Sequence, residues 1–355
     1  MSLLHPSRPD APSLSSLRPP AALPGGSFEV LGSHLLEMRD GAHAQLPGAF
    51  LGETEAALEM LRPTRAQVRV PEGTVAGDLT LRYNGQASNS LTAIVGAPIA
   101  EDLHLVSNPA VDLDGNLFAM ISGQRGTRVP VSIMKISRDL QMRPFARDLL
   151  NISALAFGPD GYLYASSRAE GVVYRLSPEG AVSTFAEGMG IATGLAFDRD
   201  GNLFVGDRSG TIFKLGPHGR HNAAEIFVFA TLEPSVAAYH LAFRDDGVLL
   251  VAAPTTSSHQ AIYAIDPDGE SRVFYRGLGR PQGMALDAGG DVYVAASLGG
   301  RRGIVRIAAN GTDADLAVSG NDLVGLCFME DDSAVLATTN TLFMVDLGIT
   351  GRALI

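Results

Sequence analysis

Seven arginines follow or precede short apolar segments in the second part of the chain, and their chemistry is the easiest to name. They are Arg125, Arg128, Arg168, Arg208, Arg280, Arg301 and Arg302. A guanidinium group binds carboxylates and phosphates in bidentate fashion, because its planar donors match two oxyanion oxygens. If the fold gathers these segments on one face, they form an anion-binding mouth, for which we select Arg125, Arg168, Arg208, Arg280 and Arg302.

A second set of polar residues stands just before other apolar segments, and we add it to the candidate ligand-binding residues: Asn108, Tyr239, His240 and Gln282. Tyr239 and His240 are distinctive, since corresponding places elsewhere hold Ser, Thr or Gly. Two interpretations stay open: they fill space and form local hydrogen bonds, or they contact a ligand. No acid and base pair and no metal-ligand set assembles among these residues, so we assign neither a catalytic residue nor a metal site.

The elements that position these residues are repeated along the chain. Turn pairs recur at intervals of 40 to 46 residues: Asp114-Gly115, Asp160-Gly161, Asp200-Gly201, Asp246-Gly247, Gly289-Gly290 and Asp331-Asp332. A period of this length is typical of four-stranded propeller blades. Six such units fill the chain from about residue 101 to its end, which predicts a six-bladed propeller.

Each unit repeats a pattern of short apolar strands as well as a turn. LAFD, NLFVGD, TIFKL and EIFVFA are rich in strand-forming residues and are separated by turn residues. One place in the first strand is always small: Ala110, Ala156, Ala196, Ala242, Ala285 and Cys327. We therefore interpret Cys327 as a buried structural thiol. The last unit lacks a fourth strand, and residues 101–106, EDLHLV, are predicted to supply it and close the ring.

These units resemble the NHL-type repeats of six-bladed propellers, a group that overlaps with gluconolactonase-like propellers. The resemblance rests on YLYASSRAEGVVYRL, NLFVGDRSGTIFKL and DVYVAASLGGRRGIVRI, and covers about 250 residues. It implies a propeller over residues 99–355. Calcium-dependent lactonases of the resembled group place Asn, Asp and Glu ligands around the mouth, where this chain offers Asn108 and Asp322. If the protein were a lactonase of this kind, it would bind a divalent cation such as calcium. Otherwise we expect no cofactor.

The front of the chain has no blade repeat. Residues 1–11 are expected to be disordered, and residues 12–98 resemble an IPT/TIG immunoglobulin-like β-sandwich, with Pro24-Gly25-Gly26, Val70-Pro71 and Asn84-Gly85 among the matching marks. Residues 1–98 carry seven Arg, no Lys and nine acidic residues, so a DNA-binding surface is not expected. We interpret this part as a structural or docking module.

Composition limits the partners. The 355 residues carry a formal net charge of −11, which argues against nucleic acid and anionic membranes as partners. The first residues lack the apolar core of a secretory signal, and no stretch is long and apolar enough to span a membrane. We therefore expect a cytoplasmic protein, with export by another route left open.

Together these patterns predict an all-β chain: a small immunoglobulin-like β-sandwich followed by a six-bladed β-propeller closed by an N-terminal strand. The leading hypothesis is a non-catalytic recognition or scaffold protein whose propeller mouth binds an anionic small molecule, a glycan or a protein segment. The alternative is an atypical gluconolactonase-like, metal-dependent lactone hydrolase.

Overall fold

The computed structural model describes residues 11–36, 46–83, 86–124, 126–216, 225–256 and 260–352. Residues 1–10 of the segment predicted to be disordered, the Asn84-Gly85 turn and Arg125 lie outside the described residues. The chain divides into two compact units, Met1–Ala97 with Ala317–Asn321, and Pro98–Leu316 with Asp322–Ile355. The ordered elements are strands, and among the described residues no helix could cross a membrane.

The first unit is all-β and has its own core. Its strands are β1 (Ser13–Arg18), β2 (Ala21–Ala22), β3 (Ser27–Ser33), β4 (Gly48–Leu51), β5 (Thr54–Arg62), β6 (Arg65–Arg69), β7 (Gly77–Tyr83), β8 (Gln86–Ala87) and β9 (Leu91–Val95). They pair in the order β1-β3-β6-β5-β4-β7-β9-β2, and β8 pairs with β7. Phe28, Val30, Val68 and Leu79 alternate with more exposed neighbours and are fully buried. The immunoglobulin-like identity of this unit stays a prediction.

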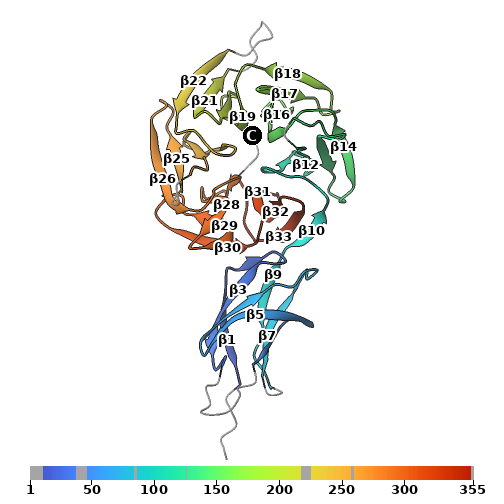
Figure 1. Cartoon of the computed structure of the whole chain (residues 1–355), viewed down its shortest axis with the longest axis vertical. Helices are drawn as coiled ribbons and strands as arrows, with labels where there is room; N and C mark the ends of the chain where they lie inside the picture. The colour runs from blue at the N-terminus through green and yellow to red at the C-terminus, as the bar shows by residue number, and fades with distance from the viewer. Residues whose placement is uncertain are drawn as a thin grey trace, which may run out of the picture. The chain divides into compact units, whose positions relative to one another are not determined.

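The second unit is a β-propeller, as the repeat predicts. Figure 1 shows its sheets arranged radially, with first strands such as β19 near the axis and fourth strands such as β22 at the rim. In four of the sheets, four strands pair in the order in which they follow one another along the chain. They are β11 (Ala110–Val111), β12 (Leu117–Met120), β13 (Ile133–Ile136) and β14 (Met142–Ala146); β15 (Ile152–Phe157), β16 (Leu163–Ser167), β17 (Val172–Leu176) and β18 (Val182–Ala186); β19 (Ala192–Phe197), β20 (Leu203–Asp207), β21 (Thr211–Leu215) and β22 (Ile226–Thr231); and β23 (His240–Phe243), β24 (Leu249–Ala252), β25 (Gln260–Ile265) and β26 (Ser271–Leu278).

A fifth separate sheet closes the ring. It contains β31 (Leu323–Phe328), β32 (Ser333–Thr338), β33 (Leu342–Asp346) and the N-terminal strand β10 (Ala97–Ala100), in the order β10-β33-β32-β31. Closure by an N-terminal strand is therefore confirmed, but the predicted segment 101–106 is wrong. Asp102 adopts a positive φ of 58°, which ends the extended chain, and Leu103 and Leu105 instead donate backbone hydrogen bonds to Asn340 and Thr339.

The remaining four strands do not form a separate sheet. They are β27 (Met284–Leu286), β28 (Val292–Leu298), β29 (Arg301–Ile307) and β30 (Ala314–Ser319), and they pair consecutively. The end of β30 is counted with the first unit, where Val318 and Ser319 pair in parallel with Ala21 and Ala22. Because the end of β30 has a further backbone partner, the described residues form five separate four-stranded sheets rather than the six that the sequence predicts.

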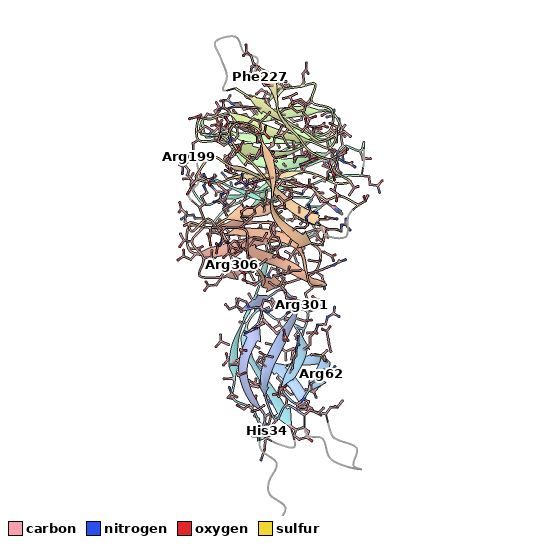
Figure 2. All side chains as sticks on the ribbon, turned by 90° about the vertical axis from the view of Figure 1, so that its left-hand side faces the viewer. His34, Arg62, Arg199, Phe227, Arg301 and Arg306 are labelled. Atoms are coloured by element: carbon pink, nitrogen blue, oxygen red, sulfur yellow. The ribbon has the colours of Figure 1, made fainter. Side chains whose placement is uncertain are left out.

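The repeated turns behave as the sequence predicts. Gly115, Gly161, Gly201, Gly247 and Gly290 all have φ between 76° and 85°, a conformation that glycine adopts without a steric penalty. In several units a carboxylate at this turn also pairs with a cation on the third strand. Arg306, labelled in Figure 2, donates from Nε to Asp291 Oδ2 at 2.7 Å. The turn carboxylates thus hold the ends of neighbouring strands together.

Candidate functional site

The first strands of the propeller line two cavities. One, which we call the mouth cavity, has a volume of about 320 Å³ and lies where these strands begin. The other, which we call the channel cavity, has a volume of about 270 Å³ and is lined by the middles and ends of the same strands. The two linings share no residue. Each cavity is therefore considered by its own chemistry.

Two arginines line the mouth cavity from the loops that follow the second strands. Arg208 Nη2 donates to the Val236 carbonyl at 3.0 Å, and Arg168 Nη2 donates to Ser122 Oγ at 3.3 Å. Arg208 Nε is buried, and no residue that the structure describes accepts a hydrogen bond from it. A buried charged donor without an acceptor is costly, so the bond to Val236 leaves this guanidinium incompletely satisfied by the described residues.

His240 lines the same cavity at the start of β23. Its side chain is buried, and its Nδ1 shares a hydrogen bond of 3.2 Å with Ser107 Oγ. Burial lowers the pKa of His240 from 6.5 to about 4, because desolvation disfavours the charged imidazolium. At neutral pH the ring is therefore uncharged, and it can donate or accept one hydrogen bond toward a ligand.

Two hydroxyls in the mouth cavity form bonds within the fold. Thr193 Oγ1 donates to the Gly206 carbonyl at 2.8 Å and accepts from the Tyr239 backbone N–H at 3.0 Å. Ser153 Oγ donates to the Ala192 carbonyl at 3.1 Å. These groups connect neighbouring first strands, so the two guanidinium groups, the imidazole and the Gln282 amide are the main candidates for ligand recognition.

The structure brings together four of the predicted ligand-binding residues and separates the others. Arg168, Arg208, His240 and Gln282 line the mouth cavity, whereas Asn108 lines the channel cavity. Arg280 and Arg302 are exposed and belong to neither lining. Arg125 lies outside the described residues. The sequence places all of these arginines in loops, but it does not show which loops point toward the axis.

Tyr239 has a packing role, which is one of the two interpretations that the sequence leaves open for it. Its side chain is fully buried, and its hydroxyl donates to the Glu233 carbonyl. The ring lies against the Cα of Gly206, where an added Cβ would come within 2.7 Å of the Tyr239 Cβ. Burial also raises the pKa of Tyr239 to about 12. Tyr239 therefore occupies the space that Gly206 leaves beside the neighbouring blade.

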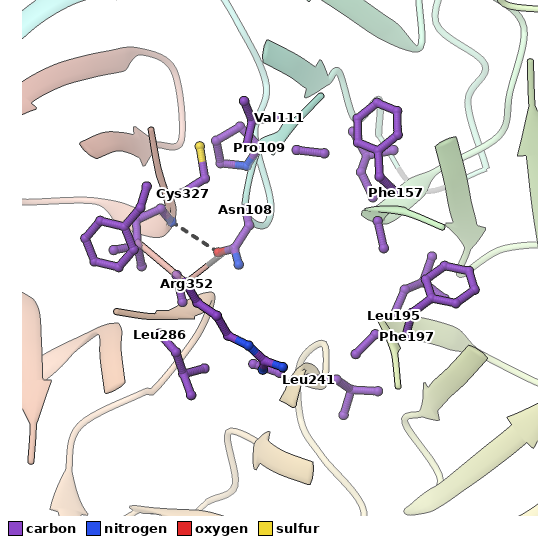
Figure 3. Close-up of a pocket in the computed structure, with 18 of the residues that line it drawn as sticks. Asn108, Pro109, Val111, Phe157, Leu195, Phe197, Leu241, Leu286, Cys327 and Arg352 are labelled. Atoms are coloured by element: carbon purple, nitrogen blue, oxygen red, sulfur yellow. Dashed lines mark hydrogen bonds between the residues drawn. The ribbon is translucent and has the colours of Figure 1, made fainter. Parts of the chain in front are cut away.

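Asn108 joins strands rather than offering ligands to a metal. Its Nδ2 donates to the Met284 carbonyl at 2.8 Å, and its Oδ1 accepts from the Leu326 N–H at 3.1 Å, the bond that Figure 3 shows. Asp322 is exposed. Among the described residues, no three His, Cys, Asp or Glu side chains are grouped so that they could hold a metal ion. Asn108 and Asp322 therefore do not fit a calcium site, which needs six to eight oxygen ligands.

The channel cavity contains residues that the sequence reasoning did not select. Four of them are the phenylalanines at the ends of first strands, and a fifth is Arg352 near the C-terminus (Figure 3). The phenylalanines occupy one repeated place, directly after the small residue: Phe157, Phe197, Phe243 and Phe328. That repetition could have identified them, whereas nothing in the local sequence indicates that Arg352 reaches the axis.

Comparisons with solved structures give the same fold. A gluconolactonase of Xanthomonas campestris is 16% identical over 71% of this chain and 89% of that chain, with a TM-score of 0.58. Auxiliary nutrient binding proteins of Bacteroides thetaiotaomicron and Bacteroides ovatus are 11% and 10% identical over 94% of this chain, covering 97% and 98% of theirs, with TM-scores of 0.55 and 0.54. No protein-family model and no curated protein matches the chain. At these identities the likeness shows the fold alone.

Proposed function

We propose that this protein is a non-catalytic binding protein whose mouth cavity holds a small anion. The observation that carries the proposal is that Arg208, whose buried Nε lacks an acceptor among the described residues, lines one cavity together with Arg168 and His240. Two guanidinium groups can hold a carboxylate or phosphate with charge-assisted hydrogen bonds, and a neutral imidazole adds one more. A cavity of about 320 Å³ suits a sugar acid or a molecule of similar size.

The names of two solved structures support a binding role. The structures that match nearly the whole of this chain include two named auxiliary nutrient binding proteins, whereas the gluconolactonase matches a smaller share. The lactone hydrolase remains the alternative. It is less well supported, because both polar ends of the Asn108 amide already bond to backbone groups, and among the described residues no three His, Cys, Asp or Glu side chains are grouped to hold a metal ion.

Three finer assignments belong to the same proposal. The consecutively paired strands β27–β30 act as the sixth blade. The first unit is an immunoglobulin-like module with a structural or docking role. The support is that its strands enclose one hydrophobic core and that β5 pairs with both β6 and β4. The protein acts in the cytoplasm, away from nucleic acid and membranes, in keeping with its net charge of −11.

The test is calorimetric titration of the full chain with matched anionic and neutral ligands, such as gluconate with glucose and glucose 6-phosphate with glucose. We expect an anion to bind, its neutral counterpart to bind at least about tenfold more weakly, and added salt to weaken the anion's binding. Equal binding of the charged and neutral members of each pair would overturn the proposal. Absence of binding by every anion tested up to millimolar concentration would do the same.

A further inference from the structure

The channel cavity is lined mainly by residues with apolar side chains, whereas Arg168, Arg208 and His240 line the mouth cavity. Three layers of residues surround the channel cavity, because most first strands contribute three consecutive residues, such as Leu155, Ala156 and Phe157, to the lining. The first layer is mostly leucine, including Leu155, Leu195, Leu241 and Leu326, and the second is alanine or cysteine. The third layer is mostly phenylalanine. A concave lining that combines apolar side chains with a small number of polar groups is typical of small-molecule sites.

The phenylalanines are held in fixed orientations by the neighbouring blade. Each packs edge to face against an aromatic ring on the second strand of the preceding blade. The centroid distances are 5.2 Å for Phe157 with Phe118, 4.9 Å for Phe197 with Tyr164, 4.9 Å for Phe243 with Phe204 and 5.1 Å for Phe328 with Tyr293. Because these rings are already packed, a ligand would meet a largely preformed apolar wall.

The layer of small residues provides the space. Ala156, Ala242 and Ala285 are partly exposed toward the cavity, so larger side chains at these places would occupy it. The volume of about 270 Å³ exceeds the roughly 150 Å³ of an apolar protein cavity that binds benzene. One or two fused aromatic rings therefore match the available space.

Arg352 places a positive charge at this apolar cavity. Its backbone N–H donates to the Leu286 carbonyl at 3.1 Å, its Nε lies 2.8 Å from Asp245 Oδ1, and its Nη1 donates to the Phe243 carbonyl. Directly before it, Gly351 lies against Phe328, where an added Cβ would come within 2.3 Å of the Phe328 Cβ. The guanidinium is thus anchored, and since it carries five N–H donors, these contacts do not exhaust them.

We propose that the channel cavity is a second ligand site, which takes a small flat aromatic carboxylate. The ring lies among the leucine and phenylalanine layers, and the carboxylate accepts hydrogen bonds from Arg352. Burial of the ring supplies the apolar part of the affinity, and the guanidinium selects the anion over a neutral molecule of the same shape. This site is independent of the mouth cavity, with which it shares no lining residue.

The experiment measures binding of 1-naphthoate and its neutral counterpart 1-naphthalenemethanol to the full chain. Ala242→Leu fills the cavity, with Ala156→Val as a second variant should the first not fold, and Arg352→Gln removes the charge. The double variant Arg168→Ala/Arg208→Ala is the matched control in the mouth cavity. Thermal unfolding of every variant establishes that it is folded.

We expect the wild-type protein to bind 1-naphthoate, and the cavity-filling variant to lose detectable binding of both probes. Arg352→Gln should weaken 1-naphthoate about tenfold while leaving the alcohol unchanged, and the mouth variant should leave both affinities unchanged. Any of four results overturns the proposal: no naphthoate binding at millimolar concentration, binding that survives the folded cavity-filling variant, an equal effect of Arg352→Gln on both probes, or loss of binding in the mouth variant. Gluconate binding by the Ala242→Leu variant tests the mouth cavity separately.

Discussion

His240 links the candidate site to the stability of the fold. In the folded protein burial lowers the pKa of its imidazole to about 4, whereas an unfolded chain has a value near 6.5. The unfolded chain therefore binds more protons between these two values, so the free energy of unfolding falls as the pH is lowered from about 6.5 to about 4. The stabilisation from the neutral form is fully present above 6.5.

We expect His240→Gln to remove this pH-dependent fall in the free energy of unfolding, which is on the order of 3 kcal/mol for a pKa shift of this size. Urea unfolding at pH 7.5 and pH 4.5 measures it, with exposed His104→Gln as the control. A wild-type protein and a His240→Gln variant with the same loss of stability between the two pH values would contradict the burial of this imidazole.

Cys327 gives a second prediction at the scale of one residue. The thiol is buried, and desolvation raises its pKa to about 12, so almost no thiolate is present near neutral pH. Ellman's reagent should react with the native protein at least about a hundredfold more slowly than with the protein in guanidinium chloride. A rapid native reaction would show that this residue is accessible and reactive rather than structural.

Residue types alone predicted part of this picture. Each first strand has a small residue at one position, which predicted that Cys327 is buried. The position of Arg168 and Arg208 in loops predicted that they face a cavity. The sequence could not separate these two from Arg302, because all three occupy loop or strand-end positions with similar neighbours. Which arginine points inward depends on blade geometry, and the choice between the two interpretations of Tyr239 depends on it as well.

At the scale of elements, Asn108 connects the first strands across the closed ring. Its side chain bonds to both β27 and β31, and it fits because Gly283 and Gly325 have no side chains. An added Cβ at these glycines would lie 2.0 Å and 2.4 Å from Asn108 Oδ1. A polar residue that joins two strands in this way stabilises the ring through its hydrogen bonds to both.

Asn108→Ala should therefore lower the free energy of unfolding by roughly 2 kcal/mol or more, since two hydrogen bonds are lost and buried backbone groups lose their partners. The exposed Asn340→Ala is a suitable control because its backbone carbonyl, which accepts from Leu103, is retained. If both variants unfold at the same denaturant concentration, Asn108 has no such connecting role.

The repeated turns and four-strand units could be predicted because they depend on local chemistry: Asp-Gly turns and runs of Phe, Val, Leu and Ile. Pairing at the ends of the chain could not. The closing strand lies at Ala97–Ala100 rather than 101–106. The sequence does not exclude 101–106, because the positive φ of Asp102, which ends the extended chain, is not visible in it. The backbone partner of β30 is likewise a long-range property.

For the whole molecule, the net charge of −11 makes the mouth cavity electrostatically distinct. Two arginines in a cavity attract anions locally, and this attraction is screened by salt. Since the residues near Asn108 do not fit a calcium site, removal of divalent cations should leave anion affinity and melting temperature unchanged. Titration and thermal unfolding with and without EDTA measure this. Calcium-dependent gluconolactone hydrolysis that EDTA abolishes would favour the hydrolase alternative instead.

Arg208→Ala and Arg302→Ala test the central claim most directly, because the first arginine lines the mouth cavity and the second is exposed and belongs to neither lining. Calorimetric titration with the tightest-binding anion is the measurement. We predict that Arg208→Ala weakens binding about tenfold to a hundredfold, as expected for loss of hydrogen bonds from a charged donor, and that Arg302→Ala has no effect. Unchanged affinity in a folded Arg208→Ala variant, or an equal loss in both variants, would contradict a binding site in the mouth cavity.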